Sequence, residues 1–146
     1  MRLLGTNEIR QAVHGRWLAP SADVTVEGVT IDSRTAKPGD LFVAVHGETH
    51  DGHDHLEAAA DAGCIAAIVD RSIEVSESRL RLFGGGMMGV EDTRKALGEL
   101  AKHYRQHLPA TVVAVTGSNG KTTVKRMIHH ILATRVVGKA SPKSFN

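Results

Sequence analysis

Three short runs of almost continuous apolar residues constrain the fold of this chain more than any other feature. They span residues 41–45, 65–69 and 111–115. A strand with one face in water alternates apolar and polar residues, whereas a strand buried on both faces reads as an unbroken apolar run. Each run is too short for an ordinary helix, so we expect three buried strands.

Helical patterns lie between and after these runs. Apolar residues recur at helical spacing over 7–17, 53–62, 93–107 and 121–133. Strands that alternate with helices indicate an α/β fold with a mainly parallel sheet. Segment 72–89 resists assignment, because three consecutive glycines from Gly84 interrupt an apolar run and favour a loop or an irregular strand.

A domain boundary is predicted at Pro109-Ala110, where a proline ends the helix over 93–107. It divides the chain into residues 1–108, with a complete α/β pattern, and residues 109–146, with one strand and one helix. The second part therefore reads as the start of a further domain.

Charge and composition exclude several classes of protein. The 18 Lys and Arg residues nearly balance the 16 Asp and Glu residues, which is unlike a dedicated nucleic-acid binder. A single cysteine, Cys64, excludes a disulfide framework within the chain and fits a reducing compartment. No apolar run approaches the length of a membrane span. We expect a cytoplasmic protein with no nucleic-acid or membrane partner.

The most specific motif lies between the third apolar run and the last helix. It consists of Thr116, Gly117, Ser118, Asn119, Gly120, Lys121, Thr122 and Thr123. The two glycines let the backbone curl so that its N–H groups point inward around phosphate oxygens, and the helix that follows adds the positive end of its dipole. Lys121 can bridge phosphates and Thr122 can ligate Mg²⁺.

This motif departs from the general pattern G-x-x-x-x-G-K-[ST], whose first glycine would fall at Val115. The alternative is a glycine-rich turn without a ligand. The order strand, glycines, lysine, two threonines and helix favours the phosphate loop.

Four histidines fall within ten residues: His46, His50, His53 and His55. With two nearby aspartates they suggest a metal site, but no cysteine or second cluster completes a tetrahedron. We interpret them as solvated loop histidines, with one or two contacting a ligand.

Two blocks of sequence resemble the ATP-dependent Mur ligases of peptidoglycan synthesis. The first contains Asp32-Ser33-Arg34, residues 37–44, Gly47 and Asp51-Gly52-His53, and is similar to the family's nucleotide-sugar-binding domain. The second is the loop 116–123, which resembles the phosphate loop of the family's central ATPase domain. The branch that joins D-alanyl-D-alanine to UDP-N-acetylmuramoyl-tripeptide is the most similar; the branch that adds the third residue is the alternative.

The resemblance implies a mechanism and a set of site residues. ATP, with Mg²⁺ on Thr122, would phosphorylate an acceptor carboxylate, and an amine would then displace phosphate from the acyl phosphate. Lys121 and Thr122 would be the catalytic residues. The residues implied in binding the UDP-N-acetylmuramoyl-peptide are Ser33, Arg34, Gly47, Asp51, Gly52, His53 and Asn146.

The resemblance also implies parts that the 146 residues lack, namely a downstream Mg²⁺ carboxylate, a modified lysine and the site for D-alanyl-D-alanine. We therefore expect a truncated central domain and a polypeptide that is inactive by itself. The resemblance also implies a monomer. A non-catalytic nucleotide-binding module remains an alternative.

Overall fold

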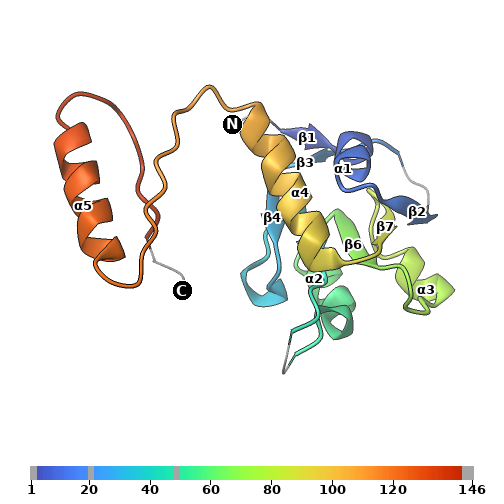
Figure 1. Cartoon of the computed structure of the whole chain (residues 1–146). Coiled ribbons are helices and arrows are strands. Elements are labelled where there is room, and N and C mark those ends of the chain that lie inside the picture. The colour runs from blue at the N-terminus through green and yellow to red at the C-terminus, as the bar shows by residue number, and fades with distance from the viewer. Residues whose placement is uncertain (1–2, 20–21, 48–49, 143–146) are drawn as a thin grey trace. The chain divides into compact units, whose positions relative to one another are not determined.

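The computed structural model describes residues 3–19, 22–47 and 50–142 (Figure 1). The chain divides into two compact units, Met1–Leu108 and Pro109–Asn146.

The first unit is built on a five-stranded sheet in the order β2-β7-β6-β5-β4. Four neighbouring strands run parallel, namely β4 (Gly28–Thr30), β5 (Asp40–Val43), β6 (Ala66–Asp70) and β7 (Met87–Val90). At one edge, β2 (Arg16–Ala19) runs antiparallel to β7. Two short strands, β1 (Leu4–Gly5) and β3 (Thr25–Val26), form a separate antiparallel pair. The predicted α/β fold with a mainly parallel sheet is confirmed.

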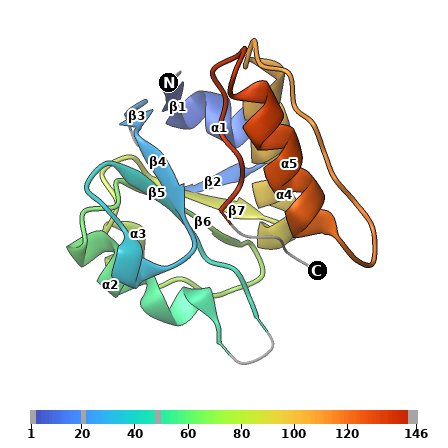
Figure 2. The same cartoon turned by 90° about the vertical axis from the view of Figure 1, so that its left-hand side faces the viewer.

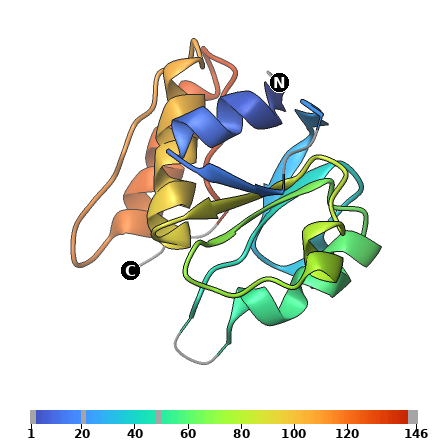
Figure 3. The same cartoon turned by 90° about the vertical axis from the view of Figure 1, so that its right-hand side faces the viewer.

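Helices cover both faces of this sheet (Figures 2 and 3). One face carries α1 (Thr6–Ala12) and α4 (Thr93–Gln106). The other carries α2 (Leu56–Asp61) and α3 (Glu77–Leu80). Two short 3₁₀ helices, η1 (Ser33–Thr35) and η2 (Gly52–His55), follow β4 and β5 in the chain.

The two faces of the central strands are both buried. In β5, Leu41 and Val43 pack toward α1 and α4, whereas Phe42 packs toward α2, and all three side chains are fully buried. Successive side chains of a strand point to opposite faces, so burial on both sides requires an unbroken apolar run. The prediction from the runs over 41–45 and 65–69 is thus confirmed.

The predicted helix over 7–17 is wrong in its second half. The helix α1 ends at Ala12, His14 adopts a φ of 53°, and the chain then enters β2. Ile9 and Trp17 match helical spacing because both pack against the same core, although Trp17 reaches it from the edge strand. Gly15 is a helix-ending residue that helical spacing alone does not take into account.

Segment 72–89 contains α3 and the start of β7, with the three glycines in a turn between them. The N–H of Gly85 donates to the carbonyl oxygen of Ile65 at 2.6 Å. A Cβ at Gly85 would lie 2.7 Å from that oxygen, so only glycine allows this close approach. The loop interpretation of the glycines is confirmed.

In the second unit, α5 (Lys121–Leu132) agrees with the helix predicted over 121–133. The strand predicted over 111–115 is not formed, and Val112 and Val113 are 61% and 58% exposed. A strand needs a neighbour for its N–H and C=O groups. Among residues 109–142 the structure contains no strand that could pair with it.

No helix in the described ranges is both long and apolar enough to span a bilayer.

Candidate functional site

The loop 116–123 has the backbone conformation that its glycines predict. Gly117 adopts a φ of 144° and Gly120 a φ of 76°, both in the region that side chains disfavour. A Cβ at Gly120 would meet no atom within 4 Å. Backbone conformation, not lack of space, therefore requires glycine there, and it turns the chain directly into α5.

Gly120 is the N-cap of α5 and offers no side chain to bond the first N–H groups of the helix. A helix N-terminus carries unsatisfied N–H donors and about half a positive charge, which together favour an anion. The Nζ of Lys121 donates to the carbonyl oxygen of Gly117 at 2.7 Å. The lysine is thus folded over the loop, next to the position where a phosphate would meet the N–H groups.

Every residue from Thr116 to Gly120 is exposed, and so are Thr122 and Thr123. The predicted nucleotide residues are therefore assembled and accessible within the second unit. Their roles toward a nucleotide stay predictions.

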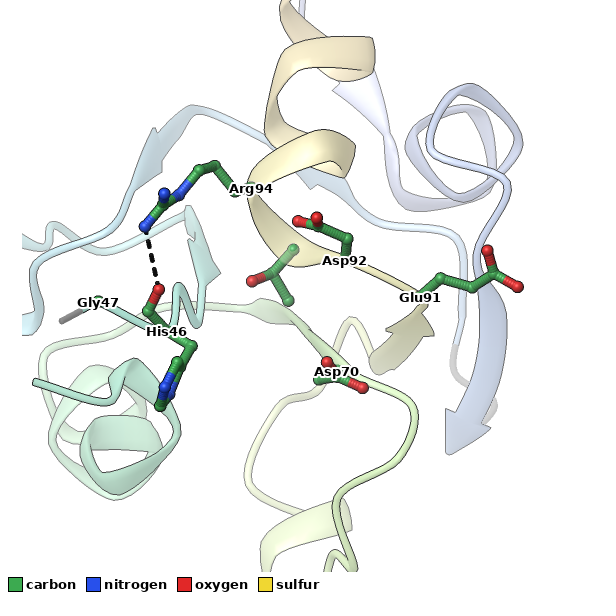
Figure 4. A pocket seen from close by; sticks show the side chains of 7 residues that line it. His46, Gly47, Asp70, Glu91, Asp92 and Arg94 are labelled. Atoms are coloured by element: carbon green, nitrogen blue, oxygen red, sulfur yellow. Dashed lines mark hydrogen bonds between the residues drawn. The ribbon is translucent and has the colours of Figure 1, made fainter.

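The second group of predicted residues lies at the carboxyl end of the parallel strands of the first unit. The four strands end at the same edge of the sheet, and Figure 4 shows residues of the segments that follow β5, β6 and β7 around one cavity. In open α/β sheets, this edge is where ligands bind. A cavity of about 560 Å³ opens there, lined by His46, Gly47, Asp70, Glu91, Asp92, Thr93 and Arg94.

Arg94 crosses this cavity from the first turn of α4. Its Nη2 donates to the carbonyl oxygen of His46 at 3.1 Å, and Figure 4 shows the side chain extended toward His46 while Glu91 points away. Asp92 caps α4 by accepting from the N–H of Lys95 at 2.9 Å. The cavity thus combines an exposed guanidinium with a helix N-terminus, both of which suit an anionic group.

Like Asp92, the other two acidic residues that line the cavity have partners. Asp70 accepts from the N–H and the hydroxyl of Ser72, both at 2.8 Å. Glu91 accepts from Arg71 at 2.5 Å. The ion pair with Arg71 offsets the negative charge of Glu91, whereas the bonds from Ser72 lower the pKa of Asp70 and keep it ionised.

The wall of the cavity is held by a network around His53. The side chain is buried; its Nδ1 lies 2.5 Å from Oδ1 of Asp51, and its Nε2 accepts from the N–H of Asp70 at 2.9 Å. Since Nε2 is an acceptor, the proton is on Nδ1 and is donated to Asp51. His46 completes the network, with Nδ1 3.1 Å from Oδ2 of Asp51.

Asp51 is kept ionised by this network. Burial by itself would raise its pKa, but hydrogen bonds from the N–H and ring of His53 and from His46 lower the pKa to about 2. Gly52 allows the close packing, because a Cβ there would lie 2.7 Å from the N atom of Val45. The motif Asp51-Gly52-His53 therefore fastens η2 to the ends of β5 and β6.

The motif Asp32-Ser33-Arg34 is a local structure at the end of β4. Asp32 caps η1 by accepting from the N–H of Arg34, and it also binds the Arg34 guanidinium at 2.9 and 2.7 Å. The guanidinium lowers the pKa of Asp32 to about 2. The side chain of Arg34 is 86% exposed and already paired, so an anionic ligand would compete with Asp32 for it.

The structure brings together only part of the predicted acceptor site. Gly47 lines the cavity, and Asp51, Gly52 and His53 support its wall. Ser33 and Arg34 are not among the residues that line it, although they follow a neighbouring strand. Asn146 lies outside the described residues. Contact of these residues with a substrate stays a prediction.

Sequence reasoning missed Thr93 and Arg94. The signal was available, because Asp92-Thr93 is a helix start directly after a buried strand, and ligands gather at such positions in parallel sheets.

Comparison with known proteins identifies the family. The Mur ligase family, catalytic domain, matches residues 25–105, and the Mur ligase middle domain matches residues 115–143. The chain belongs to the Mur ligase family. The two matches fall in the two units and include the cavity and the loop 116–123, respectively.

Several relatives carry the same name. The UDP-N-acetylmuramoyl-tripeptide–D-alanyl-D-alanine ligase of Escherichia coli is 46% identical over 112 residues, covering 77% of this chain and 23% of the relative. The ligase of that name from Bacillus subtilis is 39% identical, covering 94% and 29%. This Mur ligase chain spans about a quarter of the length of these curated relatives.

Solved structures of the same family are also similar to this chain. MurF from Acinetobacter baumannii matches with a TM-score of 0.75 and 34% identity, over 92% of this chain and 28% of that one. The MurF ligase from Thermotoga maritima in complex with ADP matches with a TM-score of 0.63 and 33% identity, over 75% and 24%.

Proposed function

We propose that this chain is the acceptor-binding and phosphate-binding part of an ATP-dependent ligase that joins D-alanyl-D-alanine to UDP-N-acetylmuramoyl-tripeptide. The observation that carries the proposal is the loop 116–123, in which two positive-φ glycines and Lys121 converge at the start of α5. The relatives named for this reaction, and the one solved with ADP, support it.

In the proposed reaction, the loop holds the phosphates of ATP while the γ-phosphoryl group passes to a carboxylate of the acceptor. The amine of the dipeptide then forms the amide bond and inorganic phosphate leaves. Catalysis of phosphoryl transfer consists mainly of positioning and charge stabilisation. The N–H groups at the start of α5 would bind the phosphate oxygens. Lys121 would release Gly117 and place its ammonium against the transferred group.

The residues present fit a magnesium ion at Thr122. Thr122 is an exposed residue in the first turn of α5, beside Lys121, and hydroxyl oxygens suit a hard cation that keeps several waters and binds phosphate oxygens. Mg²⁺ bound there would supply charge neutralisation on the phosphates.

The acceptor would occupy the cavity of the first unit. We place the diphosphate near Arg94 and the start of α4, with Gly47 against it and Arg34 recruited from Asp32. A guanidinium forks onto two phosphate oxygens, which is the geometry that a diphosphate requires. In this proposal, residues 1–108 bind the UDP-muramoyl-peptide, and residues 109–146 begin the ATP-binding domain of a monomeric cytoplasmic enzyme.

A ligation assay tests the proposal. The polypeptide that carries this chain is incubated with ATP, Mg²⁺, UDP-N-acetylmuramoyl-tripeptide and D-alanyl-D-alanine, and the acceptor is followed by mass spectrometry. We expect it to gain the dipeptide less one water, with one phosphate released per bond.

The same assay separates the alternatives. Addition of diaminopimelate to UDP-N-acetylmuramoyl-dipeptide, with no reaction of the tripeptide, would instead identify a ligase of the third residue, like the relative of that activity that is 38% identical over 112 residues. Binding of ATP without ligation of either acceptor would indicate a non-catalytic module.

A further inference from the structure

One cluster of possible metal ligands lies away from both sites. Glu8 in the first turn of α1 and the pair His103 and His107 at the end of α4 each offer one ligand atom, and these atoms all lie within 4.8 Å of one another. Among the residues that the structure describes, it is the one such group. We propose that it binds a divalent transition-metal ion of the zinc type, joining α1 to α4.

The two histidines stand on one face of a helix because they are four residues apart. Their ring centroids are 4.7 Å apart. The Nδ1 of His107 lies 2.8 Å from the carbonyl oxygen of His103. Since a carbonyl only accepts, Nδ1 carries the proton and Nε2 carries the lone pair. Metal-binding histidines are usually oriented in this way, by a hydrogen bond from the ring nitrogen that does not bind the metal to a carbonyl or carboxylate oxygen.

The third ligand comes from another helix. Oε1 of Glu8 lies 2.9 Å from Nε2 of His103. In a tetrahedral zinc site with bonds of 2.0–2.1 Å, neighbouring ligand atoms are about 3.3 Å apart. This pair is therefore already near the required spacing. The ligand atom of His107, an exposed side chain, lies within 4.8 Å of both, so the gap that it must close is at most about 1.5 Å.

The backbones of the two helices are held in place by packing. Ile9 and Val13 on the α1 side belong to the same buried cluster as Ala96 and Leu100 of α4 (Figure 3). Glu8 and His103 remain 31% and 28% exposed, so an ion can reach them. The fold thus already places two of the three protein ligands, and the fourth position of a tetrahedral ion would be open to water.

The local field also suits a cation. Both histidines lie at the C-terminal end of α4, where the helix dipole is negative. Lys102 pairs with Glu99 at 3.3 Å, and Arg105 donates to the carbonyl oxygen of Leu108. On binding, the metal takes the place of the proton between His103 and Glu8. A neutral His103 then carries its proton on Nδ1.

Calorimetric titration of the metal-free chain with ZnCl₂ tests the proposal, with Co²⁺ absorption as a spectroscopic readout of the ligand set. We expect one saturable equivalent, which His107→Gln weakens at least about tenfold, because changes even in residues behind metal ligands weaken binding 10–100-fold. Glu8→Gln should weaken it similarly. His129→Gln, an exposed histidine of α5, is the matched control and should change nothing.

Folding is followed by urea denaturation. His107 is exposed, so His107→Gln should keep the wild-type midpoint without metal. Added Zn²⁺ should raise the midpoint of the wild type and not of the variant. The proposal is overturned if the wild type shows no saturable binding, if His107→Gln binds Zn²⁺ like the wild type, or if Glu8→Gln has no effect.

Discussion

The buried imidazole of His53 gives the sharpest test of how the acceptor cavity is held together. His53→Ala removes the donor to Asp51 and the acceptor for the N–H of Asp70. A hydrogen bond to a charged group contributes about 1.5–3 kcal/mol, and a buried donor left without a partner costs about 1–3 kcal/mol. Asp51 is 34% exposed, so water replaces part of the loss. We expect the free energy of unfolding to fall by about 2–4 kcal/mol.

Urea denaturation monitored by tryptophan fluorescence measures this change. Trp17 is the single tryptophan of the chain and packs against the core of the first unit, so its signal reports that unit alone. His55→Ala is the matched control, since His55 lies in the same 3₁₀ helix and is exposed. His53→Gln should recover part of the loss, because its amide oxygen can accept from Asp70. Equal effects of His53→Ala and His55→Ala would refute the reasoning.

The same variant alters the dependence of stability on pH. The pKa of Asp51 is lowered in the folded chain to about 2 from its ordinary value of 3.8. Its contribution to stability is therefore complete above about pH 4 and is lost as the pH falls toward 2. His53→Ala removes the ring hydrogen bond that helps to lower this pKa, while the backbone N–H of residue 53 and the ring of His46 still bind Asp51. Over that interval the free energy of unfolding of the variant should therefore fall less steeply than that of the wild type.

Three further predictions concern function. In the polypeptide that carries this chain, Lys121→Ala and Thr122→Ala should each lower the rate of ligation by about two to three orders of magnitude, because each removes a preorganised group that stabilises charge. The midpoint of urea unfolding should stay unchanged. A normal turnover rate would contradict the phosphate-loop assignment. Arg94→Ala and Arg34→Ala should each weaken calorimetric binding of a UDP sugar about tenfold, whereas Arg81→Ala, an exposed arginine outside the cavity, should not; unchanged binding by either would remove that residue from the site. Residues 1–146 alone should release no phosphate from ATP when both substrates are present, and stimulated release would refute this.

The sheet could be predicted from the sequence because burial on both faces leaves a direct trace in residue type. The runs around Phe42 and Ile68 have no polar residue because each side of the strand meets a helix. The same trace misled at residues 111–115, where the apolar run is present and the strand is not. An apolar run records that a segment is suited to burial, while strand formation also needs a partner for its backbone.

The prediction of a helix over residues 7–17 was wrong in its second half for a related reason. Ile9 and Trp17 pack against one core, and a spacing rule cannot distinguish one helix that carries both from a helix and a strand that meet there. The sequence signal was Gly15, because glycine is typical of a turn, and the structure shows the turn there in the positive φ of His14.

The phosphate loop, the cavity and the proposed metal site differ in how far apart their residues lie in the sequence. This separation decides which of them could be predicted. The phosphate loop is local: Lys121 meets Gly117 four residues away, so a short motif specifies the whole arrangement. The cavity depends on Arg94 reaching His46 across 48 residues, and Glu8 meets His103 across 95. No spacing rule covers such pairs, because the sheet and the helix packing bring them together. The motif around Asp51 was recognisable, yet its contacts within the fold could not be predicted for the same reason. The Nε2 of His53 accepts from the N–H of Asp70, which lies 17 residues further along the chain at the end of β6.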